Sequence, residues 1–478
     1  MANRPKQKPQ QPAQPKAPKP TPSSASASDF AADEWIRALQ AEGVQRVKVG
    51  GFDLDGVLRG KYISLDKLRS ALNSGFGFCD VIFGWDVADA LYDNATVTGW
   101  NTGYPDILAI LDPKSRRRIP WEPGVAAMLC DFHLASGAPH PACPRSLLKR
   151  VVAKANAMDF EPKVGVEFEF FFFKETRDTL QAKGFRNLQP LDPGMFGYSW
   201  VRTGQDAELM RQIWDGCKSF GIELEGLHTE TGPGVYEAAI HYDAAVDVAD
   251  QAALFKTTLR QIAHQNGLAV TFMAKCNANL PGSSGHLHQS LWSRGKNAFY
   301  DARKKHGMSE SMQHYIAGQL QLMRELTALY SPTINSYKRT VPGLWAPLVA
   351  CWGVENRTCS VRVVAPNDPK AVRVEYRQTA ADINPYVAIA SSLAAGLYGI
   401  EKRLALGPEV VGDAGESGPN ALPRSLKEAT ALLAQSKVAG QIVGAEFVDH
   451  YVRTRDWEVR QFERAVTDWE LQRYFETV

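Results

Sequence analysis

Two acidic residues, Glu167 and Glu169, interrupt a segment of aromatic and β-branched residues at 164–173. Alternate side chains of a β-strand point to opposite faces, so both carboxylates share one face, with their Cα atoms about 7 Å apart. Two acids on an otherwise apolar strand are costly to bury without compensation, which cations would supply. A solvated strand face is the alternative, and this segment alone does not decide between the two.

Four further, mostly apolar segments carry acids, imidazoles or guanidinium groups. Their charged residues are Glu230 and Glu237, His286 and His288, Arg357 and Arg362, and Arg373, Glu375 and Arg377. Taken singly, each has a structural explanation: a solvated Glu, a pair of core or surface imidazoles, or a surface ladder of Arg and Glu. Together they predict that several strands line one cavity that binds charged ligands.

The donor types in this cavity indicate the chemistry. Carboxylate oxygens with one imidazole suit Mg²⁺ or Mn²⁺ rather than zinc. Arginines beside such metals suit a polyphosphate, because together they neutralise a transferring phosphoryl group. The chain has no Gly-x-x-x-x-Gly-Lys-Ser/Thr loop, so it is not a P-loop enzyme. The residues therefore predict a metal- and nucleotide-dependent phosphoryl-transfer enzyme with an anionic substrate.

The composition of the 478 residues is typical of a globular protein, with 44% hydrophobic and 22% charged residues and a net charge of +2. Five basic residues and no acid lie in 1–28, so the rest is mildly acidic and gives no argument for a nucleic-acid partner. Seven scattered cysteines without a Cys-x-x-Cys pair favour reduced thiols and a cytoplasmic location. No apolar run is long enough to cross a membrane, and we expect neither a membrane partner nor a secretory signal.

The elements that must position these residues fall into three parts. Residues 1–28, rich in Pro, Gln, Lys and Ser, predict a disordered tail. Short strands with Gly and Pro punctuation predict a small β-rich domain at 29–140. Strands alternate with helices in 141–478, where Asn384 and Pro385 begin a long helix.

The charged strands closely resemble those of the glutamine synthetase family over about residues 44–478. The motifs that carry the resemblance are EFE at 167–169, GPGVYE at 232–237, GSSGHLH at 282–288, NSYKRTVPG at 335–343, ENR at 355–357, RVEYR at 373–377 and NPY at 384–386. The resemblance implies an α+β fold: a small β-grasp-like N-terminal domain and a catalytic domain with an antiparallel β-funnel flanked by helices. It also implies that ATP enters one end of the funnel and glutamate the other.

Roles carry over motif by motif. The implied metal ligands form two sets, one beside glutamate and one beside ATP, for two or three ions per site: Glu169, Glu230 and Glu237, and Glu167, His286 and Glu375. The implied substrate residues are Gly282, His286, Arg339 and Arg377, and the implied nucleotide residues are His288, Ser290, Arg362, Lys370 and Arg373. The implied catalytic residues are Glu230, Arg357, which would stabilise the transferred phosphoryl group, and Asp53, which would reach a neighbouring subunit's site.

The implied reaction has two steps. The γ-carboxylate of glutamate attacks the γ-phosphate of ATP and gives a γ-glutamyl phosphate, from which an amine then displaces phosphate to form an amide. Metals and arginines supply electrostatic stabilisation. Family members place their sites between subunits of stacked rings, so the resemblance implies a homo-oligomer, expected to be a dodecamer.

The sequence departs from the family where the second substrate would bind. Ammonia-using members have a Glu in a flap shortly after the Val-Pro-Gly turn, and this chain has Trp345 there. Trp can pack on an organic amine or its cation, so we expect a glutamate–amine ligase with Trp345 in the substrate site. Pro281 and Val235 also replace the usual Asn and Gln. A true glutamine synthetase that uses ammonia and a non-catalytic structural or regulatory homologue are the alternatives.

Two loops complete these expectations. The loop at 189–200 shapes the acceptor pocket in this interpretation, and Tyr198 is its candidate for facing the amine. Some bacterial family members are adenylylated on a Tyr in the loop after the Asn-Pro-Tyr helix. The corresponding loop, 407–423, contains no Tyr, so we expect no such modification.

Overall fold

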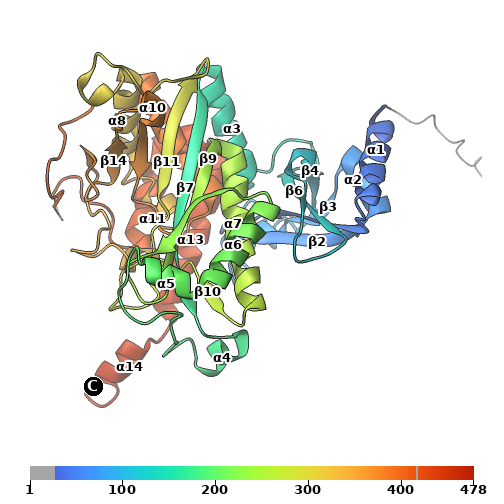
Figure 1. Ribbon diagram of the computed structural model, residues 1–478, viewed down its shortest axis with the longest axis horizontal. Helices are drawn as coiled ribbons and strands as arrows, with labels where there is room; N and C mark the ends of the chain where they lie inside the picture. The colour runs from blue at the N-terminus through green and yellow to red at the C-terminus, as the bar shows by residue number, and fades with distance from the viewer. Residues whose placement is uncertain (1–26, 416–417) are drawn as a thin grey trace, which may run out of the picture.

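The structure is a computed structural model that describes residues 27–415 and 418–478. The predicted disordered tail lies outside these ranges except for residues 27 and 28, which open helix α1 (Ala27–Ala41). Figure 1 shows a smaller part that contains the N-terminal strands and a larger part built on long strands backed by helices. No helix in the described ranges is long and apolar enough to cross a membrane.

The smaller part is a sheet in the order β2-β1-β6-β4-β3, with β5 paired to β6. Its strands are β1 (Arg46–Phe52), β2 (Leu58–Ser64), β3 (Phe76–Cys79), β4 (Asp106–Leu111), β5 (Arg117–Arg118) and β6 (Val125–His133). Strands β1 and β2 form an antiparallel hairpin that helix α2 (Leu65–Ser74) follows, and β1 runs parallel to β6. This arrangement is compatible with the β-grasp-like prediction.

The larger sheet runs β13-β14-β15-β11-β7-β9-β8, with β10 paired to β7 and β12 paired to β11. Its strands are β7 (Glu161–Phe173), β8 (Leu224–Thr229), β9 (Val235–Ala244), β10 (Ala269–Thr271), β11 (Leu287–Ser293), β12 (Lys296–Asn297), β13 (Trp352–Val354), β14 (Val361–Val364) and β15 (Arg373–Tyr376). The pairs are antiparallel, as predicted, except for β13 and β14, which run parallel across a short connection. Strand β10 is short, because only 269–271 pair with β7.

Strand β7 has the two-faced character that its sequence predicts. Phe168 and Phe170 are fully buried and pack at 6.3 and 5.9 Å, between ring centroids, from Phe255 of helix α7 (Ala245–Gln265). Glu167 and Glu169 alternate with them and lie half-buried on the opposite face. The aromatic face therefore anchors β7 to the helices, and the acidic face is left for the site.

Helices cover the outer face of this sheet, as Figure 1 shows for α3 (Pro144–Ala157), α8 (Glu310–Leu322) and α10 (Pro385–Lys402). The Asn384 side chain caps α10 by accepting a hydrogen bond from the Tyr386 backbone, as predicted. Helix α8 ends at Leu322, and a separate short helix, α9 (Thr327–Tyr330), follows it. The remaining helices are α4 (Arg177–Ala182), α5 (Trp200–Gln205), α6 (Ala207–Ser219), α11 (Leu426–Gln435), α12 (Lys437–Ala439), α13 (Ala445–Arg464) and α14 (Asp468–Tyr474). The domain boundary near residue 140 stays a prediction.

Candidate active site

Strand register brings the predicted ligands together from adjacent strands. His288 of β11 lies opposite Glu375 of β15, and Glu169 of β7 lies opposite Glu237 of β9. The backbone N–H of Glu167 donates to the carbonyl of His286 at 3.0 Å, which places His286 beside β7. One face of the sheet therefore presents acids and imidazoles that are far apart in the sequence.

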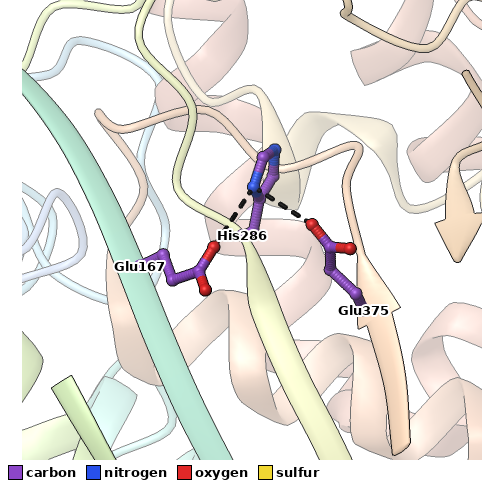
Figure 2. Close-up of side chains that lie close together, drawn as sticks. All are labelled: Glu167, His286 and Glu375. Atoms are coloured by element: carbon purple, nitrogen blue, oxygen red, sulfur yellow. Dashed lines mark ion pairs between the residues drawn. The ribbon is translucent and has the colours of Figure 1, made fainter. Parts of the chain in front are cut away.

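Glu167, His286 and Glu375 form a tight cluster, which Figure 2 shows as sticks. His286 Nδ1 lies 3.6 Å from Glu167 Oε2 and 3.4 Å from Glu375 Oε1. One ligand atom from each residue lies within 4.8 Å of the other two. Two carboxylates and one imidazole at this spacing fit a hard divalent cation such as Mg²⁺ or Mn²⁺.

Cationic neighbours keep this cluster ionised. Burial alone would raise the pKa of Glu375, but His286, Arg377 and His288 lower it to about 2. Arg377 and Arg362 each donate to Glu375, at 2.5 and 3.0 Å, so both of its oxygens are paired. The two carboxylates thus remain charged at neutral pH without a metal, since the two histidines also hold the pKa of Glu167 well below its usual range against the effect of burial.

His288 connects the cluster to the predicted nucleotide side. Its Nε2 lies 2.9 Å from Glu167 Oε1, and its Nδ1 accepts a hydrogen bond from Arg373 Nε at 3.1 Å. Because Nδ1 is an acceptor, the ring proton is on Nε2 and faces Glu167. Arg373 thereby fixes the orientation of the imidazole beside the metal-ligand candidate.

The second predicted ligand set, Glu169, Glu230 and Glu237, is looser. In the described ranges, only the first set brings its ligand atoms into a tight cluster. Glu169 Oε2 accepts from the Ser284 backbone at 2.6 Å, and Glu230 Oε2 accepts from the Thr231 backbone at 2.7 Å. Burial raises the pKa of Glu169 and that of Glu237, with only partial compensation from neighbouring donors. This side of the site is therefore rich in acid and poor in fixed cations.

His228 supports the second set, although the family motifs assign no role to it. It lies directly opposite Glu237 in the β8–β9 register, with its Nε2 3.2 Å from Glu237 Oε1. The ring of Tyr198 stacks on that of His228, with centroids 4.5 Å apart, and Tyr198 also hydrogen bonds to Glu230. His228 and Glu230 are two residues apart, and this spacing was the feature of the sequence that could have identified His228. Tyr198, which its position in the sequence made the candidate for facing the amine, lies beside the second ligand set.

The predicted glutamate-binding residues are packed tightly together. Arg339 is buried, and burial lowers the pKa of its guanidinium to about 10 even though Glu169 opposes the effect. A Cβ at Gly282 would meet Ala274 O at 2.6 Å and Arg339 Cγ at 2.7 Å. Only glycine fits there beside the arginine.

The remaining nucleotide-side candidates differ in exposure. Ser290 is buried and accepts a hydrogen bond from Trp292 Nε1 at 3.0 Å. Lys370 and Arg357 are exposed, and Arg362 is half-buried and pairs with Glu355 as well as with the cluster. The side chains of Lys370 and Arg357 are therefore accessible from solvent.

Two predicted residues lie outside this cluster in the chain. Asp53 receives hydrogen bonds from Arg59 Nε at 2.8 Å and from the Val57 backbone at 2.9 Å, and its carbonyl accepts from the side chain of Asn384. Burial, aided by Asp55, raises the pKa of Asp53 to about 7. Trp345 is 72% exposed, with φ of 59° in the left-handed region.

Comparisons with known proteins agree with this geometry. Residues 141–474 match the model of the glutamine synthetase catalytic domain. The type-1 glutamine synthetase 2 of Dictyostelium discoideum is 48% identical over 90% of this chain and 84% of its own. A glutamate–isopropylamine ligase from a Pseudomonas species is 37% identical over 92% of this chain and 97% of its own.

A third relative, the gamma-glutamylethanolamide synthetase of Streptomyces coelicolor, is 37% identical over 93% of this chain and 95% of its own. Among solved structures, the complex titled GmaS/ADP superposes with a TM-score of 0.80 at 29% identity, covering 92% of this chain and 99% of the other. The same fold and the same order of elements therefore extend beyond the matched catalytic region.

Proposed function

The chain belongs to the glutamine synthetase family, and from this premise we propose an ATP-dependent ligase that joins the γ-carboxylate of glutamate to an organic amine through a γ-glutamyl phosphate. The observation that carries the choice of acceptor is Trp345, an exposed aromatic side chain in the flap position. Two relatives, named a glutamate–isopropylamine ligase and a gamma-glutamylethanolamide synthetase, support it. The tight cluster with its arginines supports a catalytic over a purely structural role.

We assign the residues as follows. Glu167, His286 and Glu375 hold one Mg²⁺ or Mn²⁺ beside the ATP phosphates, and Glu169, Glu230 and Glu237 hold another beside glutamate. When bound, the ions would neutralise charge on the phosphate oxygens and make the γ-phosphorus more electrophilic. The ADP complex among the similar solved structures supports a nucleotide as a ligand of this chain.

Different side chains act in the two steps of the reaction. Arg339 and Arg377 orient the glutamate carboxylates, and the exposed Arg357 stabilises the charge on the transferred phosphoryl group. Glu230 then accepts a proton from the incoming amine, with Tyr198 hydrogen bonded to it. Trp345 covers the carbon skeleton of the amine and excludes water that would hydrolyse the acyl phosphate.

We also propose a cytoplasmic homo-oligomer of stacked rings. The position of Asp53 supports it, because its hydrogen bonds hold it against the start of α10 rather than at Glu167 or Glu237 of its own chain. For a neighbouring copy to receive this acid in its site, the pairing with Arg59 would have to open, because Asp53 is 3% exposed within its own chain. Cross-linking and sedimentation measure the assembly, and a fully active monomer would contradict this part.

An acceptor panel tests the reaction. We expect phosphate release that requires ATP, glutamate and Mg²⁺ or Mn²⁺, with isopropylamine, ethanolamine or putrescine preferred to ammonium, and a γ-glutamyl amide in the mass spectrum. Ammonium is the competitor that must be included, since the 48% identical relative is named a glutamine synthetase. A preference for ammonium would establish that second function, and no turnover with any acceptor would favour the non-catalytic one.

A further inference from the structure

One buried arginine of helix α13 contacts two segments that carry candidate site residues. Arg455 is 4% exposed; its Nη2 donates to Asp55 Oδ1 at 2.7 Å, and its Nη1 donates to the backbone carbonyl of Pro332 at 2.8 Å. Asp55 lies in the turn between β1 and β2, and Pro332 directly precedes the segment that ends at Arg339. A single rigid fork of donors therefore joins the two segments.

The first segment is the turn 53–57, which presents the candidate catalytic acid Asp53. Asp53 Oδ1 accepts from the backbone N–H of Asp55 at 3.0 Å, so the acid is tied to its own turn. The Asn384 side chain donates to two backbone carbonyls of the turn, at 3.0 and 3.1 Å. Together with the contact from Arg455, this gives the turn two anchors that do not involve the carboxylate of Asp53.

The second segment presents the candidate glutamate ligand Arg339. The hydroxyls of Thr333 and Ser336 donate to the Asp382 carboxylate at 2.8 and 2.7 Å, and the Arg339 N–H donates to the Ser336 carbonyl at 3.2 Å. These hydrogen bonds begin one residue after the carbonyl that Arg455 holds. A displacement of that carbonyl would therefore reach Arg339.

The two contacts need the shape of a guanidinium. Within residues 27–415 and 418–478, no second cation lies within 4.0 Å of the Asp55 carboxylate. A lysine could pair with Asp55, but its single ammonium group does not reproduce a fork that points at a carboxylate and a carbonyl together. The relation between the two segments therefore depends on Arg455.

We propose that Arg455 is a positioning residue of the ligase, which holds the Asp53 turn and the Arg339 segment in a fixed relation. It acts through Asp55 on the turn that a neighbouring copy would receive, and through Pro332 on the glutamate side of its own site. Its effect on rate rests on the proposed ligase function, whereas its anchoring of the two segments does not.

Steady-state kinetics of Arg455→Met test this role in the full chain with Mg²⁺. We expect KM for glutamate and KM for the best acceptor amine each to rise about tenfold, since a misplacement of about 1 Å is costly for positioned groups. KM for ATP should stay within about twofold, because strand pairing holds His288 and Arg373. Equal changes in all three KM values, or an unchanged KM for glutamate, would overturn the proposal.

Two further variants separate the two contacts. Asp55→Ala removes the link to the turn and should raise KM for the amine while leaving KM for glutamate near its original value. Arg455→Lys should keep the charge-assisted pairing with Asp55 and lose the Pro332 carbonyl, so it should raise KM for glutamate alone. If both variants raised both values alike, the two segments would not be positioned separately, and this assignment would be wrong.

Arg460→Met is the matched control in the same helix. Arg460 donates to Asp93 Oδ2 at 2.9 Å, and its Cζ lies 5.5 Å from the ring centroid of Trp457, as that of Arg455 lies 4.9 Å from the ring of Tyr451. Both arginines therefore pair with an acid that lies before β4 and pack on an aromatic ring of α13. All KM values should stay unchanged in the control. A rise in glutamate KM there would assign the effect to general docking of α13 and overturn the proposal.

Hydrogen exchange distinguishes failure of this inference from failure of the proposed function. In Arg455→Met, amides of 53–57 and 333–339 should exchange roughly fivefold faster, and those of β7 should not change. If Arg455→Met does not fold, Arg455→Lys should show the faster exchange in 333–339 alone. These measurements need no turnover, so they report the anchoring even if no amine is used. Unchanged exchange in both segments, or an equal increase in β7, would overturn the inference whatever the enzyme does.

Discussion

The two carboxylate sets of the site are held in opposite ways. Glu167 and Glu375 face histidines and arginines, which lower their pKa values despite burial. Glu169 and Glu237 lie half-buried in the same sheet with few cations nearby, and burial raises their pKa values. The neighbours of Glu167 and Glu375 favour their charged forms before any ligand binds, whereas burial disfavours the charged forms of Glu169 and Glu237.

This difference matches a division of labour. The set of Glu167 and Glu375, the fixed set, would serve phosphoryl transfer, which is common to the family, and the set of Glu169 and Glu237, the adaptable set, would meet glutamate and the amine, where acceptors vary. Tyr198, which stacks on His228 beside the second set, is 74% exposed. Specificity can change there without disturbing the buried cluster.

The largest expected effect comes from the fixed set. Glu167→Gln removes a charge that faces both His286 and His288, and kcat should fall by roughly 10³-fold, since loss of one electrostatic contact to the reacting groups costs about 10²–10³. Phosphate release at saturating Mg²⁺ measures it. Glu161→Gln, an exposed acid at the start of the same strand, is the control and should change little. Activity within tenfold of the unmodified chain would mean that the cluster is not the metal site.

The two sets should respond oppositely when charge is removed from the metal-free protein. Glu375→Gln leaves Arg362 and Arg377 without their buried carboxylate and should cost about 3 kcal/mol at pH 7. Glu237→Gln removes a poorly compensated buried acid and should raise Tm. Calorimetry with a chelator present makes the comparison. Equal effects of the same sign would remove the distinction between the sets.

Low pH should remove the stabilisation that the charged Glu375 side chain provides. A carboxyl with a pKa of about 2 in the folded state and an ordinary value in the unfolded state stabilises the protein above the ordinary value, and this stability is lost as pH falls toward 2. The Tm difference between Glu375→Gln and the unmodified chain should therefore shrink below about pH 4.5. A difference that persists to the lowest pH measured would assign it to packing rather than charge.

The sequence predicted the residues of the site, but it did not predict how differently the charges of the two ligand sets are compensated. The alternation in β7 is a local pattern, so it predicted which face carries Glu167 and which carries Phe168. The separation of the two sets depends on which arginine reaches which acid, and this follows from the register between β11, β14 and β15. A single strand carries no information about such pairings.

The same limit explains His228 and the parallel β13–β14 pair. His228 faces Glu237 only because β8 and β9 pair in one register, which is offset by an irregularity near Gly226. The motif around 352–364 is strand-like in either direction, and its six-residue connection 355–360 does not reveal a parallel crossover. Ammonium and amine acceptors likewise could not be separated by the metal ligands, which both reactions share.

Changing the flap should alter acceptor choice rather than phosphoryl transfer. Trp345→Glu supplies a carboxylate that attracts ammonium and removes apolar contact with an alkylamine. We expect the ratio of kcat/KM for ammonium to that for isopropylamine to rise roughly 30-fold. Trp100→Glu, at a Trp that is 77% exposed in the smaller part of the chain, is the matched control. A true glutamine synthetase would show little gain with ammonium, and that outcome would exclude Trp345 as the acceptor determinant.

The smallest effect should come from His228, which acts on the adaptable set through Glu237. His228→Phe keeps an aromatic ring for Tyr198 but removes the nitrogen 3.2 Å from Glu237. His228→Gln keeps a donor near that position but removes the stacking partner. Because partners of metal ligands tune affinity about tenfold or more, the Phe variant should need about tenfold more Mg²⁺ for half-maximal rate. The Gln variant should instead raise KM for the amine while leaving the Mg²⁺ requirement near its original value. If both variants shifted Mg²⁺ and amine alike, His228 would be a packing residue, and the adaptable set would not depend on it.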